Sequence, residues 1–536
     1  MANAAELIAS RLYQAGVRTA YGIPGGEVLT MIKALDEKGI EFVMTKHENA
    51  AGFMAEGAYH ATGAPAVLVA TVGPGVANAV NFIVNAMQDR VPVIYLTGRV
   101  DPKEAVTYTH QVFDHAALLR PVTKASFEIT NGAVEEIIDK AVAIALDDPP
   151  GPVHVDLPIS VADCEQVKRL VKNRAIVNKG IAGGAQFEQA KEWFASAKTP
   201  LVIAGVEVLY QHTEKNVEQF CQQFRVPLIT TYKGKGIMSE DHELCLGGAG
   251  LSPKANQILM PFMQQADVVL LVGYDPIEMR SEWRNPWPSS TRIIELSAQP
   301  NTHFMHQADL SFVCQVGSSL TALGEDRDTD SQSWAGGEVA AIKASLQTAF
   351  QVEPEWGPAK LIKLARDILP VETVATVDTG AHRILLSQMW TCYQARSLLQ
   401  SSALCTMGCA LPLAVGYKKT RPEVPVVAFS GDAGLEMVLG DLATCRDSRV
   451  PIIIIVFVDA SLALIELKQR ALEFKNVGVD SSGYTDFVQV AHGFDLDAAW
   501  VRDADTFKTE LQRALKNPKS TLLACTIDRK SYDGKF

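Results

Sequence analysis

The sequence lacks any hydrophobic run long enough to cross a membrane. Its longest aliphatic stretch, residues 451–458, has the length of one buried strand, whereas a transmembrane helix needs roughly 20 apolar residues. The N-terminus also lacks a basic segment followed by an apolar one, and its Leu7, Ile8 and Leu12 fall on one face of an expected helix. We therefore expect no membrane partner, and we expect folded structure from the first residues of the sequence onward.

Positive charge is in deficit. The chain has 49 Lys and Arg against 61 Asp and Glu, and its formal net charge is −12. A protein of net negative charge is not attracted to phosphate backbones or anionic lipids. We therefore expect no nucleic-acid partner.

Paired cysteine motifs are missing as well. The nine cysteines are scattered and contain no pair of CxxC motifs, a pattern that indicates a reducing compartment. Cys405 and Cys409 are close in sequence, but no second pair accompanies them, so we interpret them as buried packing residues rather than zinc ligands. These features predict a cytoplasmic protein.

Glycine and proline are too few for a collagen-like or low-complexity chain, with 38 Gly and 26 Pro in 536 residues. At about 150 residues per domain, the length predicts three or four domains. Short apolar runs alternate with helical stretches, which is typical of parallel sheets covered by helices on both faces. The clearest runs are 66–70, 91–96, 200–204, 268–272, 425–429 and 451–458.

Two polar, turn-rich segments interrupt this alternation. Residues 165–184 and 324–358 have the composition of linkers. The expected fold is therefore α/β, with three doubly wound parallel-sheet domains at residues 1–165, 185–325 and 358–536.

A strand, a glycine-rich turn and a helix meet at Gly431-Asp432-Ala433-Gly434. Small residues let the backbone approach a ligand, and the free amides of a helix N-terminus attract an anion, so the turn predicts a diphosphate site. Asp459 follows one strand–helix–strand unit later and should lie beside Asp432, at the ends of neighbouring parallel strands. Two carboxylates beside a diphosphate favour Mg²⁺. From these residues alone, an ordinary turn and a solvated acid are an equally good interpretation.

Four further segments resemble those of the thiamine-diphosphate-dependent enzymes, and most closely acetolactate synthase. They are residues 22–26, 46–51, 71–78 and 405–412, and the likeness runs nearly end to end. Residues 273–278 and 476–487 resemble the catabolic, FAD-independent acetolactate synthases more than the biosynthetic ones. The resemblance implies a pyrimidine-binding first domain, a central domain, and a third domain that binds the diphosphate and Mg²⁺.

The same resemblance implies the cofactor contacts. Glu48 would hydrogen-bond the aminopyrimidine ring and promote loss of the thiazolium C2 proton; a helix-start acid favoured by the helix dipole is the alternative. Met407 would fill the hydrophobic wedge that bends the cofactor, or else be plain core, and the backbone of Gly408 would meet the pyrimidine. His382 would contact the diphosphate, unless it is an ordinary surface histidine. The other expected cofactor contacts are Gly26, Asn78, Gly431, Ala433 and Gly434.

The implied metal ligands are Asp432, Asp459 and the carbonyl of Ser461. The family normally has Gly-Asp-Gly and Asn-Asn where this chain has Gly-Asp-Ala and Val-Asp. The additional carboxylate of Asp459 should strengthen metal ligation and repel the cofactor's phosphates. We therefore expect cofactor loading to depend unusually strongly on Mg²⁺.

The expected reacting centre departs from the family pattern. Gln111 aligns with the glutamine that faces this centre in acetolactate synthases, or is an ordinary loop residue. His110 replaces an aromatic residue and is either a proton donor or an isosteric substitute. Lys468 aligns with a tryptophan that shapes the acceptor pocket, to which Leu462 would also belong. A lysine there predicts an anionic substrate group; a solvated helix lysine is the alternative.

The resemblance implies decarboxylation of a 2-oxoacid and transfer of the acyl unit to an acceptor carbonyl, as in acetolactate synthesis. Pyruvate is the expected 2-oxoacid. FAD is not expected, because the segment from Leu201 has one glycine where a dinucleotide fingerprint needs a cluster. The alternatives are a 2-oxoacid decarboxylase or carbon–carbon lyase that acts on another substrate, an anionic one included, and a cofactor-binding regulatory relative without turnover. The site would lie between subunits of a homodimer or homotetramer.

Overall fold

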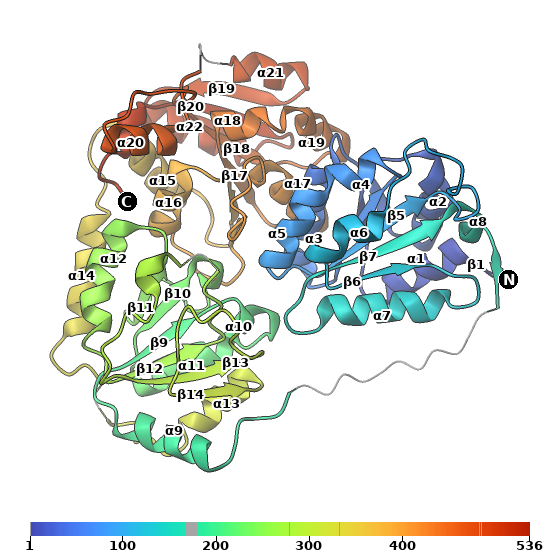
Figure 1. Ribbon diagram of the computed structural model, residues 1–536. Coiled ribbons are helices and arrows are strands. Elements are labelled where there is room, and N and C mark those ends of the chain that lie inside the picture. The colour runs from blue at the N-terminus through green and yellow to red at the C-terminus, as the bar shows by residue number, and fades with distance from the viewer. Residues whose placement is uncertain (1, 168–178, 278, 332, 482, 484) are drawn as a thin grey trace.

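Three lobes make up the molecule, and each is built on a six-stranded parallel sheet (Figure 1). The computed structural model describes residues 2–167, 179–277, 279–331, 333–481, 483 and 485–536. The predicted α/β class with three parallel sheets is confirmed. Among the described residues, no helix is both long and apolar enough to cross a bilayer.

The first lobe has the strand order β3-β2-β4-β5-β7-β6. Its strands are β2 (Thr19–Gly22), β3 (Glu41–Met44), β4 (Ala66–Ala70), β5 (Val93–Arg99), β6 (Ala125–Glu128) and β7 (Pro152–Pro158). Its helices are α1 (Ala4–Gln14), α2 (Leu29–Lys38), α3 (Glu48–Thr62), α4 (Pro74–Asn78), α5 (Val80–Gln88), α6 (His115–Leu119), α7 (Val134–Leu146) and α8 (Ile159–Ala162). Strands β1 (Ala2–Asn3) and β8 (Glu165–Gln166) form a separate antiparallel pair.

The central lobe has the order β11-β10-β9-β12-β13-β14. Its strands are β9 (Pro200–Ala204), β10 (Leu228–Thr231), β11 (Cys245–Ala249), β12 (Val268–Val272), β13 (Arg292–Ser297) and β14 (Leu310–Val313). Its helices are α9 (Ala185–Ser196), α10 (Glu207–Tyr210), α11 (Glu214–Phe224), α12 (Pro253–Met263), α13 (Val316–Leu323) and α14 (Glu338–Ala349).

The third lobe has the order β16-β15-β17-β18-β20-β19. Its strands are β15 (Val374–Val377), β16 (Leu398–Gln400), β17 (Val426–Gly431), β18 (Ile453–Val458), β19 (Asp497–Val501) and β20 (Thr521–Thr526). Its helices are α15 (Pro358–Ile368), α16 (Ala381–Met389), α17 (Ala410–Thr420), α18 (Asp432–Glu436), α19 (Leu442–Ser448), α20 (Ala463–Ala471), α21 (Phe487–Gly493) and α22 (Ala504–Ala514).

The first and third sheets share one topology. In each, the chain forms an inner strand, adds the second strand on one side, and then crosses to the other side for the third. Such a reversal creates a switch point at the carboxyl ends of the two strands that flank it, where α/β sheets bind ligands. The switch points lie between β2 and β4 in the first lobe and between β15 and β17 in the third.

Helices α3 and α17 join the first and third lobes. Their buried apolar residues belong to one hydrophobic core that also includes residues of both sheets. The two helices approach closely because Gly57 and Gly416 face the partner backbone: a Cβ on Gly416 would overlap the carbonyl of Met54. Since side chains are absent at these two positions, the lobes share a continuous core rather than a solvated boundary.

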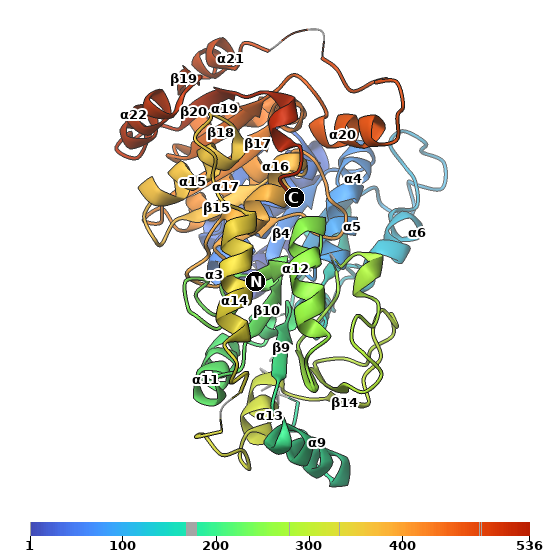
Figure 2. The same cartoon turned by 90° about the vertical axis from the view of Figure 1, so that its left-hand side faces the viewer.

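The prediction of a plain linker over residues 324–358 is wrong. Helix α14 lies within that segment and runs beside α12 on the central lobe (Figure 2). Val339, Ile342, Leu346 and Phe350 recur at helical spacing and pack against the apolar face of the central sheet. Polar residues on the other side of the helix concealed this stripe. Most of the other predicted linker, residues 168–178, lies outside the described residues.

Candidate active site

The two aspartates predicted to lie together meet at the carboxyl edge of the third sheet. Strands β17 and β18 are parallel neighbours, with Gly431 opposite Phe457. One carboxylate oxygen of Asp432 accepts the amide of Ala433 at 2.8 Å, and the other accepts the amides of Asp459 at 3.1 Å and Ala460 at 2.7 Å. These bonds fix the Asp432 carboxylate at the start of α18.

Asp459 is held beside Asp432 in a buried position. Its carboxylate accepts the amide of Ser461 at 2.9 Å. Burial, followed by the charge of Asp432, raises the pKa of Asp459 to about 8. Burial also raises the pKa of Asp432. Two carboxyl groups that oppose each other's ionisation form a donor set that a divalent cation would stabilise.

His382 lies against the glycine turn that contains Gly431. It is buried, so the surface-histidine alternative is wrong, and its ring stacks on Phe457 with centroids 5.1 Å apart. A Cβ on Gly431 would lie 3.2 Å from the His382 ring, so only a small residue fits there. The His382 Nε2 atom is buried without a hydrogen-bond partner among the described residues. Burial lowers the pKa of His382 to about 3, which keeps the ring neutral and able to offer one N–H to an anion.

Asp378 organises this edge, although the sequence did not single it out. It follows β15 and is fully buried. Its carboxylate accepts the amides of Gly408 at 2.9 Å and Cys409 at 3.2 Å, and the hydroxyl of Ser430 at 3.1 Å. A Cβ on Gly434 would overlap this carboxylate. One aspartate therefore fixes the loop before α17 and the first turn of α18 at the switch point.

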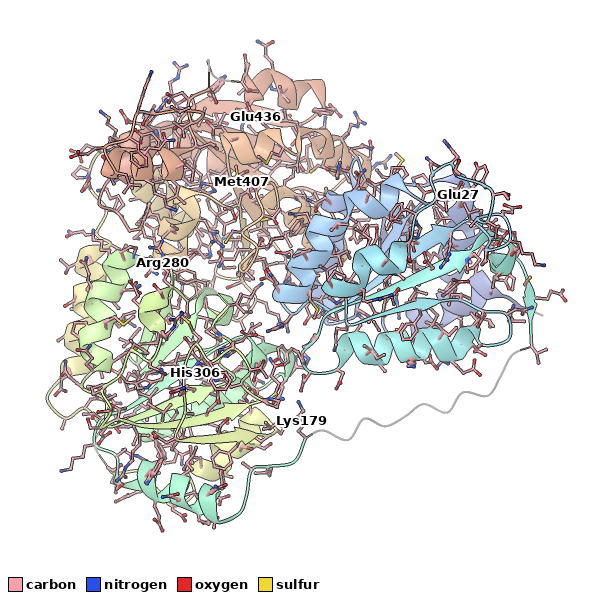
Figure 3. The ribbon with its side chains drawn as sticks, viewed as in Figure 1. Glu27, Lys179, Arg280, His306, Met407 and Glu436 are labelled. Atoms are coloured by element: carbon pink, nitrogen blue, oxygen red, sulfur yellow. The ribbon has the colours of Figure 1, made fainter. Side chains whose placement is uncertain are left out.

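Met407 and Gly408 lie on that loop. Gly408 has a φ of +80°, and a Cβ there would approach Val438 at 3.0 Å and the carbonyl of Gly434 at 3.4 Å. Met407 is half-buried, and Figure 3 shows it on the third lobe. The two residues lie close to the glycine turn because Asp378 holds both segments.

Glu48 and Asn78 meet in the first lobe. Glu48 is the first residue of α3, and Asn78 is the last residue of α4. The Asn78 side-chain amide donates to the Glu48 carboxylate at 3.0 Å. Glu48 is 5% exposed, and Gly75 leaves room above its other oxygen, since a Cβ there would lie 3.3 Å away. The carboxyl group is thus oriented by one hydrogen bond and still accessible to a ligand.

Gln111 packs against the glycine turn that precedes α4 and contains Gly73. A Cβ on Gly73 would lie 2.8 Å from the Gln111 Cβ, and both residues have positive φ. Gln111 and His110 are exposed in the loop before α6. Gly26 faces open space on the neighbouring turn. The first lobe therefore gathers Gly26, Glu48, Asn78 and Gln111 at the carboxyl edge of its sheet.

Helix α20 carries the predicted pocket residues. Leu462 caps its N-terminus, and its amide bonds to the carbonyl of Val479 at 2.8 Å. Lys468 is exposed on the helix. The hydroxyl of Ser461, just before the helix, is buried without a hydrogen-bond partner among the described residues. The helix begins at Ala463, four residues after Asp459.

Three family models match successive parts of this chain. The N-terminal thiamine pyrophosphate binding domain of the thiamine pyrophosphate enzymes matches residues 2–118, the central domain matches 187–323, and the C-terminal thiamine pyrophosphate binding domain matches 378–525. The chain belongs to the thiamine pyrophosphate enzymes. Thiamine pyrophosphate is the compound called thiamine diphosphate above. The prediction of a cofactor-dependent enzyme of this family is confirmed.

Curated relatives cover nearly the whole chain. The acetolactate synthase of Bacillus subtilis is 28% identical over 98% of this chain and 93% of its own length. The probable acetolactate synthase large subunits of Methanocaldococcus jannaschii and Methanococcus aeolicus are 28% and 27% identical, over 98% and 99% of this chain and 92% of each relative. This thiamine pyrophosphate enzyme is therefore similar to acetolactate synthases over its full fold.

Proposed function

We propose that this enzyme decarboxylates a 2-oxoacid and joins the acyl unit to a second carbonyl compound, as in acetolactate synthesis. Pyruvate is the 2-oxoacid that we propose as its substrate. One observation supports the proposal above all. The buried Glu48 carboxyl, oriented by Asn78 at 3.0 Å, stands at the carboxyl edge of the first sheet in a chain that aligns end to end with acetolactate synthases. A protein that only bound the cofactor would not require an acid–base group there.

Thiamine diphosphate, when bound, supplies a carbon nucleophile and stabilises the carbanion left by loss of CO₂. In our proposal Glu48 would hold and move a proton on the aminopyrimidine ring of the cofactor. Met407 would support the cofactor, and the backbone of Gly408 would meet the pyrimidine. The residues that would hold the diphosphate are His382, Gly431, Ala433 and Gly434, whereas Gly26 and Asn78 would contact the cofactor from the first lobe.

The donor set of the third lobe fits a diphosphate and Mg²⁺. His382 Nε2 and the Ser461 hydroxyl are buried polar atoms without protein partners in the described part of the chain. The Asp432 and Asp459 carboxylates repel each other, which a cation would relieve. We assign Asp432, Asp459 and the Ser461 carbonyl as the Mg²⁺ ligands in this proposal. A neutral His382 would donate to a phosphate oxygen without adding charge.

A flavin-free central lobe is part of the proposal. At the switch point of that sheet, between β9 and β12, the Glu207 carboxylate accepts the amide of Ala298 at 2.7 Å and the hydroxyl of Ser297 at 3.0 Å. Both donors are thereby bonded to a side chain of the protein itself. A buried acid that already uses them disfavours FAD, as does the absence of a glycine cluster in this region. The flavin-free, catabolic branch of the acetolactate synthases is the one we propose.

We also propose that the active site is completed by a second copy of the chain, in a homodimer or homotetramer. Large apolar side chains are exposed around both halves of the site. Val106, Tyr108 and Phe113 are exposed on the loop that carries Gln111, and Met437 is 63% exposed just after α18. Exposed apolar residues gathered around a site are typical of an interface.

An anionic substrate other than pyruvate is the second candidate. Lys468 is exposed on α20, and no ion pair of the described residues includes it, whereas Arg470 on the same helix bonds Glu466 and Asp533. A free ammonium on the helix that follows Asp459 would attract a carboxylate, sulfonate or phosphonate group. Gln111, His110 and Leu462 would line the same reacting centre.

The first experiment is pyruvate turnover by the purified protein with Mg²⁺ and thiamine diphosphate, with identification of the product. We expect acetolactate from the wild type, at least 100-fold less from Glu48→Gln, and wild-type rates from Glu37→Gln, whose carboxylate is exposed on α2. If pyruvate is not consumed while the cofactor binds, acetolactate synthesis is excluded. Turnover of an anionic 2-oxoacid, lost in Lys468→Met, would then support the second candidate.

A further inference from the structure

Glu27 lies at the switch point of the first sheet. It belongs to the short helical turn Gly26–Val28, which follows the end of β2. Thr71, directly after β4, donates its hydroxyl to the Glu27 carboxylate at 2.5 Å. Strands β2 and β4 flank the switch point, so the Glu27 and Thr71 pair spans the place where such sheets bind ligands. Figure 3 shows Glu27 on the first lobe.

The surroundings of Glu27 are glycines. A Cβ on Gly25 would overlap the Thr71 hydroxyl, and its distance to the Glu27 carboxylate would be 3.2 Å. A Cβ on Gly98 would lie 2.9 Å from the Glu27 Cβ. No cation neutralises this half-buried carboxylate among the ion pairs of the described residues, and the Thr71 hydroxyl is the one donor that they give it. The Glu27 carboxyl group is half-buried, has glycines beside it, and accepts one hydroxyl, so it keeps acceptor capacity for a ligand.

Thr71 lies between Glu27 and Glu48. The position of a Cβ on Gly75 would be 3.1 Å from the Thr71 methyl carbon and 3.3 Å from the Glu48 carboxylate. The adjoining turn at Gly73 carries Gln111. Two carboxyl groups therefore face one glycine turn from different elements, and Asn78 orients only the second of them.

We propose that Glu27 is a second catalytic acid–base residue, which exchanges a proton with the substrate oxygens while Glu48 serves the cofactor. The proposal rests on the function proposed above. It assigns Glu27 to the carbonyl compounds because Glu27 is only half-buried, whereas Glu48 is the more deeply buried of the two carboxyl groups.

The proton that Glu27 gives up in this role is returned to it within one turnover. As the electron pair of the donor carbon forms the new carbon–carbon bond, the acceptor's carbonyl π bond opens and its oxygen takes a proton from the Glu27 carboxyl. On product release, the electron pair that had bound the donor carbon would return to thiamine diphosphate, which would supply it for the next turnover. The donor oxygen becomes the product ketone and gives its proton back to Glu27. No external oxidant, reductant or acid is required.

The test compares Glu27→Gln and Glu27→Ala with Thr71→Val in the full-length enzyme. We expect both Glu27 variants to form ligated product at least 100-fold more slowly. Their thiamine diphosphate affinity and melting temperature should stay close to those of the wild type. Formate, which can occupy the space left by the side chain, should restore product formation in Glu27→Ala in a saturable manner. Thr71→Val should lose less than tenfold, because it keeps the carboxyl group.

Glu37→Gln is the matched control and should not respond to formate. Glu27→Gln with rates within threefold of the wild type would overturn the role of Glu27 and leave the proposed function standing. Loss of cofactor affinity or stability without formate rescue would also overturn it, because Glu27 would then be structural. A wild type inactive on every 2-oxoacid, in spite of bound cofactor, would instead refute the proposed function and with it this role.

Discussion

The Nδ1 atom of His115 lies 2.8 Å from a carboxylate oxygen of Asp156, and both side chains are buried. The same oxygen accepts the Thr97 hydroxyl at 2.6 Å, and Thr97 in turn lies 2.8 Å from His154. His115 is the first residue of α6 and directly follows the loop that carries His110 and Gln111. The pair therefore ties this loop to β7 at the centre of the first lobe.

We predict that Asp156→Asn lowers the free energy of unfolding by about 2–3 kcal/mol at neutral pH. The amide nitrogen of Asn is a donor, and it would replace a carboxylate oxygen that accepts hydrogen bonds from buried partners. The histidine partners hold the pKa of Asp156 well below its ordinary value of 3.8, against the effect of burial. A depressed pKa contributes stability above the ordinary pKa, and this contribution is lost as pH falls. The difference between wild type and variant should therefore shrink below about pH 4.

Thermal unfolding at several pH values measures this effect. Asp505→Asn is the control, since the Asp505 side chain is 92% exposed. An Asp156→Asn protein as stable as the control at neutral pH would contradict the prediction.

Glu56 should make the fold less stable as pH rises. Burial raises its pKa from 4.5 to about 8, and its carboxyl group lies 3.3 Å from His60 and 3.2 Å from Asn85. A raised pKa contributes stability that is complete below the ordinary pKa and is lost as pH rises to about 8. Glu56→Gln keeps a neutral side chain of the same shape. We expect it to remove a slope of up to about 1.4 kcal/mol per pH unit between about pH 5 and 8.

The measurement is the melting temperature across that range, with Glu37→Gln as the exposed control. Parallel curves for the wild type and Glu56→Gln would show that Glu56 is ionised in the folded protein, against this prediction.

Asp459→Asn should weaken the dependence of cofactor binding on Mg²⁺. The Asp432 and Asp459 carboxylates oppose each other, and together they oppose a diphosphate unless a cation lies between them. We expect the ratio of thiamine diphosphate affinities with Mg²⁺ and with EDTA to fall at least tenfold in the variant. Removal of the repulsion should also raise the melting temperature of the metal-free protein. An unchanged affinity ratio would refute the idea.

Gly416→Ala should separate the first and third lobes. Its methyl group would overlap the Met54 carbonyl on α3, and backbone cannot move aside as a flexible side chain can. We expect a loss of about 3 kcal/mol or more, with lowered solubility. Gly493→Ala is the matched control, because a Cβ there meets nothing within 4 Å. Equal melting temperatures for the two variants would show that the helices can shift at little cost.

The strands and the main features of the third-lobe site could be predicted from the sequence. Buried parallel strands are short apolar runs between polar stretches, and the run at 451–458 contains β18, Ile453–Val458. The Asp432 and Asp459 pair could be predicted because each residue follows such a run, and parallel strands end at one edge.

Other features could not be predicted, because they depend on contacts distant in sequence. Asp378 looks like any acid after a strand until its carboxylate meets the amides of Gly408 and Cys409. The sequence prediction considered the glycine pair before Glu27 and not Glu27 itself. Its partner Thr71 follows another strand, so their contact could not be inferred from sequence spacing. Helix α14 was missed because its apolar stripe is interrupted by polar residues, and only packing on the central sheet makes the stripe visible.

The first and third sheets share one strand order, which makes their loops comparable position by position. An identical path through six strands places the loops of the two lobes at equivalent positions, whereas the central lobe has a different strand order. Corresponding positions can then be paired. The turn at 71–75, after the third strand of the first sheet, matches the turn at 431–434 after β17, and the segment at 25–27 matches 378–382 after β15. On this path the first lobe carries Glu27 and Glu48, and the third lobe carries Asp378, His382 and Asp432. In our proposal, one strand path thus supports a proton-handling crevice in one lobe and an anion-holding crevice in the other.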